Sequence, residues 1–267
     1  MAHNFWWDYQ SGERFREILD IKPASGHRIM LDAMPGLIDS ATDWAISDAG
    51  LGLTETTISN FAGFDEKGLP EFMRMRKAIQ YGESLDGMTA ILKKGNNGGY
   101  ANTWLMIDVN TNEIGKLELG LKNVIFSSAT DGYFVGSNFP ENPKLIAEEA
   151  PSYAPKGNNC EQRRMRWIDL IAKKKGQIDV ETAKAFISDS TNPATGATDG
   201  HNGALCGKFG NDGAVNAKAV DAAMLKSFSF WARLGIPDGT TLPGKTNPGP
   251  GEVFAVPGMP WVEVRGR

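Results

Sequence analysis

Residues 100–119 carry the strongest local pattern in this sequence, two runs in which apolar and polar side chains alternate. Alternation with period two is typical of a strand with one buried face. The runs flank Asn110-Thr111-Asn112, and Asn tolerates the left-handed backbone of a turn and bonds to its own main chain. The stretch therefore predicts a β-hairpin with a polar turn.

Further strands are predicted where short β-prone runs are separated by Gly, Pro, Asp and Ser. These runs are Met1–Trp7, Arg28–Met34, Trp44–Ser47, Gly50–Ile58, Asn123–Ser127, Tyr133–Gly136 and Ala214–Val220.

The segment Glu71–Leu92 changes to a helical period, with apolar residues three and four positions apart. The apolar face is predicted to consist of Phe72, Met75, Ile79, Leu85, Met88 and Leu92. Pro70 precedes this helix, where a missing N–H costs nothing, and Gly95 follows it, where a left-handed cap is needed.

Two more helices are predicted near Glu161–Lys174 and Val180–Ser188. Their inward positions are expected to be Met165, Ile168, Ile171, Ala183 and Ile187. A short helix or turn is expected at Ser11–Leu19 and a short amphipathic piece at Met224–Leu234. Because runs of strands are separated by runs of helices, the order favours an α+β layered fold over alternating βαβ units. Residues 1–234 are expected to form one domain and residues 235–267 an extended Pro/Gly-rich tail.

Composition excludes several classes of function. The net charge of −4 and the lack of a long Lys/Arg run argue against nucleic acid as a partner. No run approaches the roughly 20 apolar residues that span a bilayer, so no transmembrane segment is expected. The two cysteines, Cys160 and Cys206, form no CxxC signature, and the compartment stays open. The three histidines are isolated, so no metal is expected. The sequence has no P-loop and no glycine fingerprint of a dinucleotide fold, and no cofactor is expected.

Two polar positions at the ends of predicted strands are candidates for a site. Glu55, in Thr54-Glu55-Thr56-Thr57, is a charged residue in an otherwise uncharged strand. Asn138 follows an apolar run, and its amide could donate to a developing oxyanion or simply start the turn before Pro140. Cys160 is interpreted as a residue at the start of a capped helix, in preference to a nucleophile.

Several ordered motifs together resemble a known family. Ala2-His3-Asn4-Phe5-Trp6-Trp7-Asp8-Tyr9 is similar to the AHN strand of phospholipase B-like proteins and of acyl-coenzyme A:6-aminopenicillanic acid acyltransferase-like hydrolases. The likeness continues to about Leu234, through the segments 34–38, 52–58, 99–122, 131–140, 159–164 and 213–218.

The resemblance implies an N-terminal-nucleophile hydrolase with a four-layer αββα sandwich and autoproteolysis at an internal Cys. The thiolate of that Cys attacks an amide or ester, with its own α-amino group as the base. By likeness, Thr57 and Asn138 are oxyanion-hole candidates, with Glu55 beside Thr57. His3 and Asn4 lie on the strand beside the nucleophile, and these two and Glu55 are expected to bind substrate.

The nucleophile itself is expected to be absent from this sequence. In the family it stands a short strand and turn upstream of the AHN motif, and here residue 1 directly precedes that motif. Cys160 and Cys206 match later family positions. We therefore expect a truncated chain or a split subunit that lacks the first, nucleophile-bearing strand and is inactive alone.

The expected function is that of a C–N or ester hydrolase or acyltransferase, acting on an acylated small molecule, peptide or lipid. The alternative is a non-catalytic remnant that binds an acyl ligand or a partner chain. A separate N-terminal fragment or a second copy is the expected protein partner.

Overall fold

The computed structural model describes residues 1–267 apart from 13, 246 and 251. The chain divides into two units, one of residues 18–156 with 266–267 and one of residues 1–17 with 157–265. Each unit is built around its own β-sheet with helices packed beside it, so the predicted α+β class is confirmed.

The first unit contains a seven-stranded sheet in which every strand pairs with its neighbours in sequence. In sheet order the strands are β2 (Glu17–Ile21), β3 (Ile29–Ala33), β4 (Trp44–Ser47), β5 (Leu51–Thr57), β6 (Asn102–Asp108), β7 (Glu113–Leu119) and β8 (Val124–Ala129). The predicted hairpin is β6 and β7, paired in antiparallel register, and Asn112 in its turn adopts φ 57°. The hairpin lies inside the sheet, between β5 and β8.

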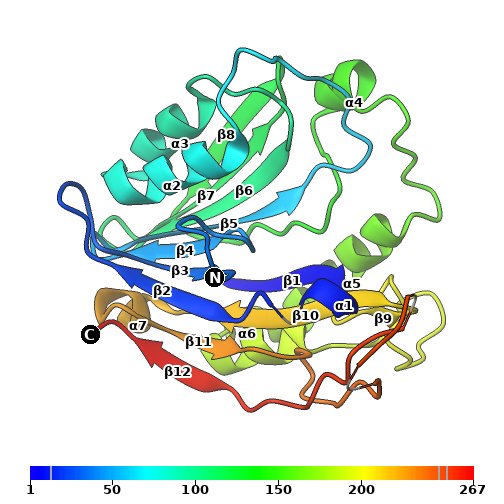
Figure 1. The fold of residues 1–267 in the computed structure, drawn as a ribbon. Helices are drawn as coiled ribbons and strands as arrows, with labels where there is room; N and C mark the ends of the chain where they lie inside the picture. Colours follow the sequence, from blue (N-terminus) through cyan, green and yellow to red (C-terminus); the bar gives the residue numbers. More distant parts are fainter. Residues whose placement is uncertain (13, 246, 251) are drawn as a thin grey trace. The chain divides into compact units, whose positions relative to one another are not determined.

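One face of this sheet is covered by α2 (Glu71–Tyr81) and α3 (Leu85–Lys93), as Figure 1 shows. Alternate residues of β5, β6 and β7 point to the helices, because side chains along a strand alternate between faces. The buried cluster joins Leu53, Trp104 and Leu117 of the sheet to Met75 and Met88 of the helices.

The single helix predicted for Glu71–Leu92 is wrong, because the chain breaks between Tyr81 and Leu85. Gly82 is extended, and a Cβ there would collide with Met88 and the Ala78 carbonyl. Ser84 then starts α3, since its Oγ accepts a hydrogen bond from Gly87 N at 3.1 Å. Phe72, predicted to face inward, is 46% exposed. The predicted left-handed Gly95 is confirmed, with φ 68°.

Replacing Ser84 with alanine should lower the free energy of unfolding by about 1 kcal/mol, the usual cost of losing a side-chain N-cap. Urea denaturation followed by circular dichroism measures the change. Ser128→Ala, at an exposed position on β8, is the matched control and should change the value by less than about 0.5 kcal/mol. Equal effects of the two substitutions would contradict the capping role of Ser84.

Two more segments of this unit differ from the prediction. Tyr133–Gly136 forms no strand, and the chain instead leads into α4 (Pro143–Glu149), where the sequence analysis places no helix. Asn142 caps α4 by accepting from Lys144 N at 2.9 Å, and Pro143 takes the first helical position. The Asn-Pro pair is thus a short-range helix signal that the apolar period does not reveal.

The second unit contains a sheet in the order β1, β10, β11, β12, with β9 paired to β10. The strands are β1 (Ala2–Asp8), β9 (Lys208–Phe209), β10 (Asp212–Ala219), β11 (Ser229–Arg233) and β12 (Val262–Arg265). The helices are α1 (Tyr9–Gly12), α5 (Asn159–Lys174), α6 (Val180–Ile187) and α7 (Ala222–Lys226). The predicted amphipathic piece Met224–Leu234 is wrong: it divides into the end of α7 and strand β11.

The segment 235–267 ends in β12, which pairs antiparallel with β11. The Lys184 ammonium of α6 lies 4.2 Å from the ring centroid of Trp231 on β11 and 5.3 Å from that of Trp261, just before β12. These cation–π contacts hold the C-terminal strand against α6.

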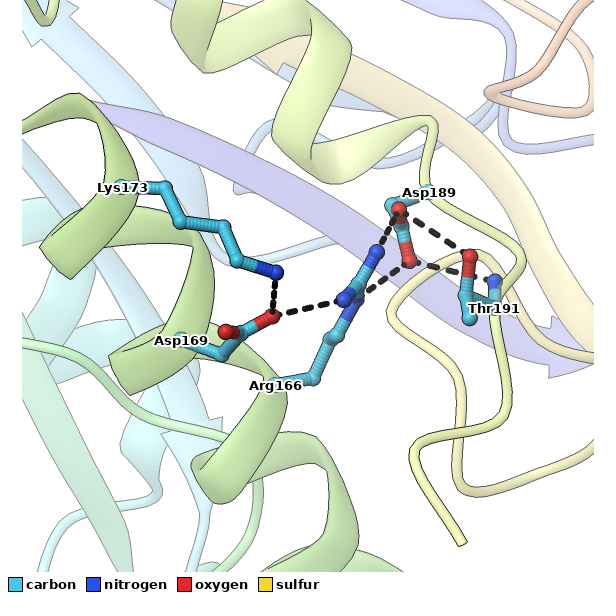
Figure 2. A network of polar contacts seen from close by, with 5 residues as sticks. All are labelled: Arg166, Asp169, Lys173, Asp189 and Thr191. Atoms are coloured by element: carbon cyan, nitrogen blue, oxygen red, sulfur yellow. Dashed lines mark hydrogen bonds and ion pairs between the residues drawn. The ribbon is translucent and has the colours of Figure 1, made fainter. Parts of the chain in front are cut away.

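Helix α5 is joined to the segment after α6 by an ion-pair network (Figure 2). Arg166 binds both carboxylate oxygens of Asp189, at 2.9 and 2.6 Å, and also donates to Asp169 at 2.8 Å. Lys173 donates to the same Asp169 oxygen, and Thr191 donates to Asp189. The bidentate geometry orients the loop after α6 on the polar side of α5.

Met165 and Ile168 of α5, predicted to face inward, are 65% and 44% exposed, whereas Ile171 and Ile187 are buried as predicted.

Candidate functional site

The five candidate residues belong to two different units. Glu55, Thr57 and Asn138 lie in the unit of the seven-stranded sheet, and His3 and Asn4 lie on β1 of the other unit. Each group is described within its own unit.

Thr57 and Asn138 meet at the C-terminal end of β5. The Asn138 backbone N–H donates to Thr56 Oγ1 at 2.6 Å, and its side-chain Nδ2 donates to Thr57 O at 3.1 Å. The Asn138 carbonyl accepts from Ser59 N at 3.2 Å. Asn138 has φ 65°, a left-handed conformation that Asn adopts more readily than most residues. Backbone and side chain of Asn138 are therefore both held in a fixed orientation against the strand end.

The Thr57 hydroxyl lies on the face of β5 that also carries Glu55, because residues two apart on a strand share a face. Thr57 Oγ1 donates to Tyr100 Oη at 3.0 Å and lies 3.5 Å from Glu55 Oε2. Tyr100 Oη lies 3.2 Å from Glu55 Oε1 and 3.3 Å from Asp43 Oδ2. Asn102, with its amide turned to satisfy both of its polar atoms, donates to Glu55 Oε2 at 2.6 Å. Thr57 is thus one end of a hydrogen-bonded network of five side chains.

Burial gives this network unusual acid–base properties. Glu55 and Asp43 are 8% and 5% exposed. Desolvation, then the charge of Asp43 and a hydrogen bond to its carboxyl, raise the pKa of Glu55 well above its usual value. Desolvation and the same two carboxyls also raise the pKa of Tyr100. The network therefore favours protonated, neutral groups.

On β1 of the other unit, Asn4 is anchored to the backbone of neighbouring segments. Its Nδ2 donates to Ile187 O at 2.5 Å and to Leu205 O at 3.1 Å. His3 is paired in register with Lys218 of β10. Burial, and then the Lys218 charge, hold the pKa of His3 well below its usual value, so its imidazole is neutral at pH 7. Neutral imidazole has one donor and one acceptor nitrogen.

Lys218 is a fully buried lysine that the sequence analysis does not single out. It is 0% exposed, and its Nζ donates to Asn216 Oδ1 at 2.7 Å. Asn216 in turn donates to Phe15 O at 3.0 Å. Both residues lie in the segment 213–218, which the sequence analysis compares with the family. A lysine at an alternating position of an apolar strand is the signal that could have marked it.

Both cysteines are buried, and Cys206 lacks the surroundings of an activated nucleophile. Cys206 is 0% exposed, and desolvation with the nearby Asp238 charge raises the pKa of its thiol to about 12. Cys160 is buried at the start of α5, where its Sγ lies 3.4 Å from Asn159 Oδ1 and 3.6 Å from Arg163 Nη2. Its backbone N–H donates to Asn158 Oδ1 at 2.8 Å, in agreement with the predicted capped helix start.

Tyr100, Asp43 and Asn102 also escape the sequence analysis. Tyr100 follows Gly98-Gly99 and is 37% exposed, although its hydroxyl is directed at the carboxyls. Asp43 has φ 53°, a left-handed conformation that nothing in the local sequence predicts.

Within the described ranges 1–12, 14–245, 247–250 and 252–267, no group of three or more His, Cys, Asp or Glu side chains is arranged to hold a metal ion. The same residues include no helix that is both long and apolar enough to cross a membrane.

Comparison with known proteins gives matches to phospholipase B-like proteins. The model of the family described as Phospholipase B matches residues 1–159. The chain is 26% identical over 166 residues to phospholipase B-like 1 of Homo sapiens, a match that covers 54% of this chain and 30% of the human protein. It is 30% identical over 128 residues to phospholipase B-like 2 of Bos taurus, covering 40% of this chain and 21% of the bovine protein. These matches thus span less than a third of the length of either curated relative.

Among solved structures, a mutant of conjugated bile acid hydrolase from Clostridium perfringens aligns with a TM-score of 0.46 and 11% identity. That alignment covers 87% of this chain and 81% of the other.

Proposed function

This chain belongs to the phospholipase B family, and on that premise we propose that it forms part of an N-terminal-nucleophile hydrolase or acyltransferase. The bond attacked is an amide or an ester of an acylated small molecule, peptide or lipid. The proposed fold is a four-layer αββα sandwich that lacks the nucleophile-bearing strand.

The fixed orientation of Asn138 is the observation that carries this proposal. An oxyanion donor is effective when it is held in place before charge develops, because no reorganisation is then needed during the reaction. The bonds from Asn138 to Thr56 Oγ1 and Thr57 O supply that constraint. In the proposed reaction, the Asn138 amide stabilises the tetrahedral oxyanion and Thr57 maintains the geometry of the strand end.

We assign the substrate-facing role on β1 to His3 and Asn4. The anchoring of Asn4 to the carbonyls of Ile187 and Leu205 supports a positioning role for this residue. A neutral His3 beside Lys218 can accept a hydrogen bond from a substrate or donate one to it.

The nucleophile is proposed to be a Cys outside these 267 residues. The burial of both thiols and the raised pKa of Cys206 support this assignment. The missing segment would come from polypeptide preceding the AHN motif or from a separate fragment that acts as the partner.

Hydrolysis assays test the proposal in two forms of the protein. The purified 267-residue chain should show no thiol-dependent hydrolysis of N-acyl amides or fatty-acyl esters, because it supplies no activated thiolate. The second form is the chain extended by an in-frame, Cys-containing segment that is read from the coding DNA upstream of Met1. This extended protein should hydrolyse either N-acyl amides or fatty-acyl esters. Iodoacetamide should abolish that activity.

Two results would contradict the proposal. One is thiol-dependent hydrolysis by the 267-residue chain alone. The other is the absence of hydrolysis by the extended protein when isothermal titration shows that it still binds an acyl ligand, which would favour a non-catalytic binding protein.

A further inference from the structure

The buried carboxyls of Asp43 and Glu55 form a carboxyl–phenol cluster with Tyr100 in the seven-stranded unit, and the hydrolytic function proposed above does not use it. Asp43 precedes β4, Glu55 lies on β5, and Tyr100 lies just before β6. The three side chains come together because β4 and β6 are both hydrogen-bonded to β5.

The hydrogen-bond donors around this cluster favour an additional proton. Tyr100 has one hydrogen for the two carboxyl oxygens that lie within 3.3 Å of its Oη, one from Asp43 and one from Glu55. The single hydrogen of the Thr57 hydroxyl has both Tyr100 Oη, at 3.0 Å, and Glu55 Oε2, at 3.5 Å, as acceptors. Two ionised carboxylates have only acceptors, so a proton on one of them supplies the donor that this close pair needs.

The charges around the pair favour retention of this proton. Helix α2 contributes Glu71, a third carboxyl, which is 7% exposed and whose Oε1 has no hydrogen-bond partner among the described residues. Asp39, in the loop before β4, adds a further negative charge near Glu71. The positive charge of Arg74, on the same helix, opposes these charges at Glu71, and its guanidinium donates to the carbonyls of Leu69 and Leu92. Like charges at short range in a dry site disfavour full ionisation.

We propose that Asp43 and Glu55 share one proton, and that through Tyr100 this shared proton positions Thr57 and the end of β5 where Asn138 is bound. Protonated, the pair is bridged by hydrogen bonds to Tyr100, which fixes the Thr57 hydroxyl. Deprotonated, the two carboxylates repel each other and Tyr100 can donate to only one of them. Tyr100, Glu55 and Asp43 are positioning residues, since none is assigned a contact with the reacting atoms.

The proposal predicts a specific pH dependence of stability. An acid whose pKa is raised by folding stabilises the folded state at low pH, and this contribution is lost as the pH rises from the unfolded pKa toward the folded one. His3, whose pKa is lowered, contributes with the opposite sign. The useful quantity is therefore the difference in melting temperature between the wild type and Glu55→Gln, measured from about pH 5 to about pH 8.

Glu55→Gln keeps a donor that can bond to Asp43 and cannot ionise. The melting temperature of the wild type should fall relative to this variant by several degrees as the pH rises through the interval. Glu113→Gln, at the solvent-accessible start of β7 in the same sheet, is the matched control. The difference in melting temperature between the wild type and Glu113→Gln should not change with pH. If the difference between the wild type and Glu55→Gln did not change with pH either, the proposal would be overturned.

Infrared spectroscopy reports on the proton directly, even if Glu55→Gln fails to fold. The wild type at pH 7 should show the C=O stretching band of a protonated carboxylic acid, and Asp43→Asn should alter it. Asn tolerates the left-handed backbone at this position, so Asp43→Asn is expected to fold. A wild-type spectrum in which no such band responds to Asp43→Asn would overturn the shared proton.

Positioning of the strand end is read from the side-chain amide resonance of Asn138 by NMR. In the wild type, the chemical shift of this resonance should change with pH, with the same midpoint pH as the infrared band of the carboxylic acid. In Tyr100→Phe this change in chemical shift should be lost. A resonance that stays in place while the carboxyl titrates would refute the positioning role. The catalytic meaning of that role rests on the proposed function, but none of these readouts uses hydrolysis, so the two can fail separately.

Discussion

Replacing Asn138 with alanine in the complete hydrolase is expected to lower kcat by about a hundredfold to a thousandfold, the usual effect of removing one oxyanion donor. The loss should fall on kcat more than on KM, because the amide would interact with charge that exists only in the transition state. The measurement is steady-state hydrolysis by the protein that includes the preceding Cys-containing segment.

Backbone strain must be separated from the loss of the donor in this experiment. Asn138 has φ 65°, and alanine pays about 1 kcal/mol in the left-handed region. Asn60 is exposed with φ 60° in the same unit, so Asn60→Ala imposes a comparable backbone cost away from the candidate site. Asn138→Asp tolerates the same backbone conformation but loses the N–H donor.

Asn138→Asp should therefore lose activity as Asn138→Ala does, and Asn60→Ala should keep it. If Asn138→Ala retained full kcat, Asn138 would be only a turn residue before Pro140, the other reading of the sequence.

Trp104→Ala should produce the largest loss of stability, about 3–5 kcal/mol in the free energy of unfolding. Trp104 is 0% exposed on β6, inside the cluster formed by the seven-stranded sheet with α2 and α3. Removing the indole would leave a cavity between sheet and helices that their packed backbones cannot close. Urea denaturation followed by circular dichroism measures the loss.

The control substitutions for Trp104 separate volume from hydrogen bonding. Ile125 on β8 is 46% exposed, so Ile125→Ala should cost less than about 1 kcal/mol. Trp104 Nε1 has no hydrogen-bond partner within the described residues, and Trp104→Phe removes that buried donor while keeping a ring. Trp104→Phe should therefore cost much less than Trp104→Ala. A cost close to that of Trp104→Ala would show that the indole N–H is satisfied in solution.

Elements with a complete local signal agree closely between sequence and structure. Strand β4 has the predicted bounds Trp44–Ser47, and the hairpin of β6 and β7 lies within the predicted residues 100–119. The break between α2 and α3 was missed because the apolar period continues across Gly82 and Ser84. Side-chain period describes which face is apolar, whereas the break depends on how closely Met88 approaches Gly82.

The residues of the candidate site also fall into two groups, those that the sequence could propose and those that only the structure revealed. Thr57, Glu55 and Asn138 could be proposed from strand ends, polar residue types and resemblance, because these are properties of short segments. The amino-acid sequence by itself determined strand β4, the hairpin and the family. Only the tertiary structure decided that Asp43, Glu55 and Tyr100 meet at one hydrogen-bonded cluster, because pairing of β4 and β6 with β5 joins residues far apart in the chain. Their protonation depends on the water that this packing excludes, and no local pattern in the sequence carries that information.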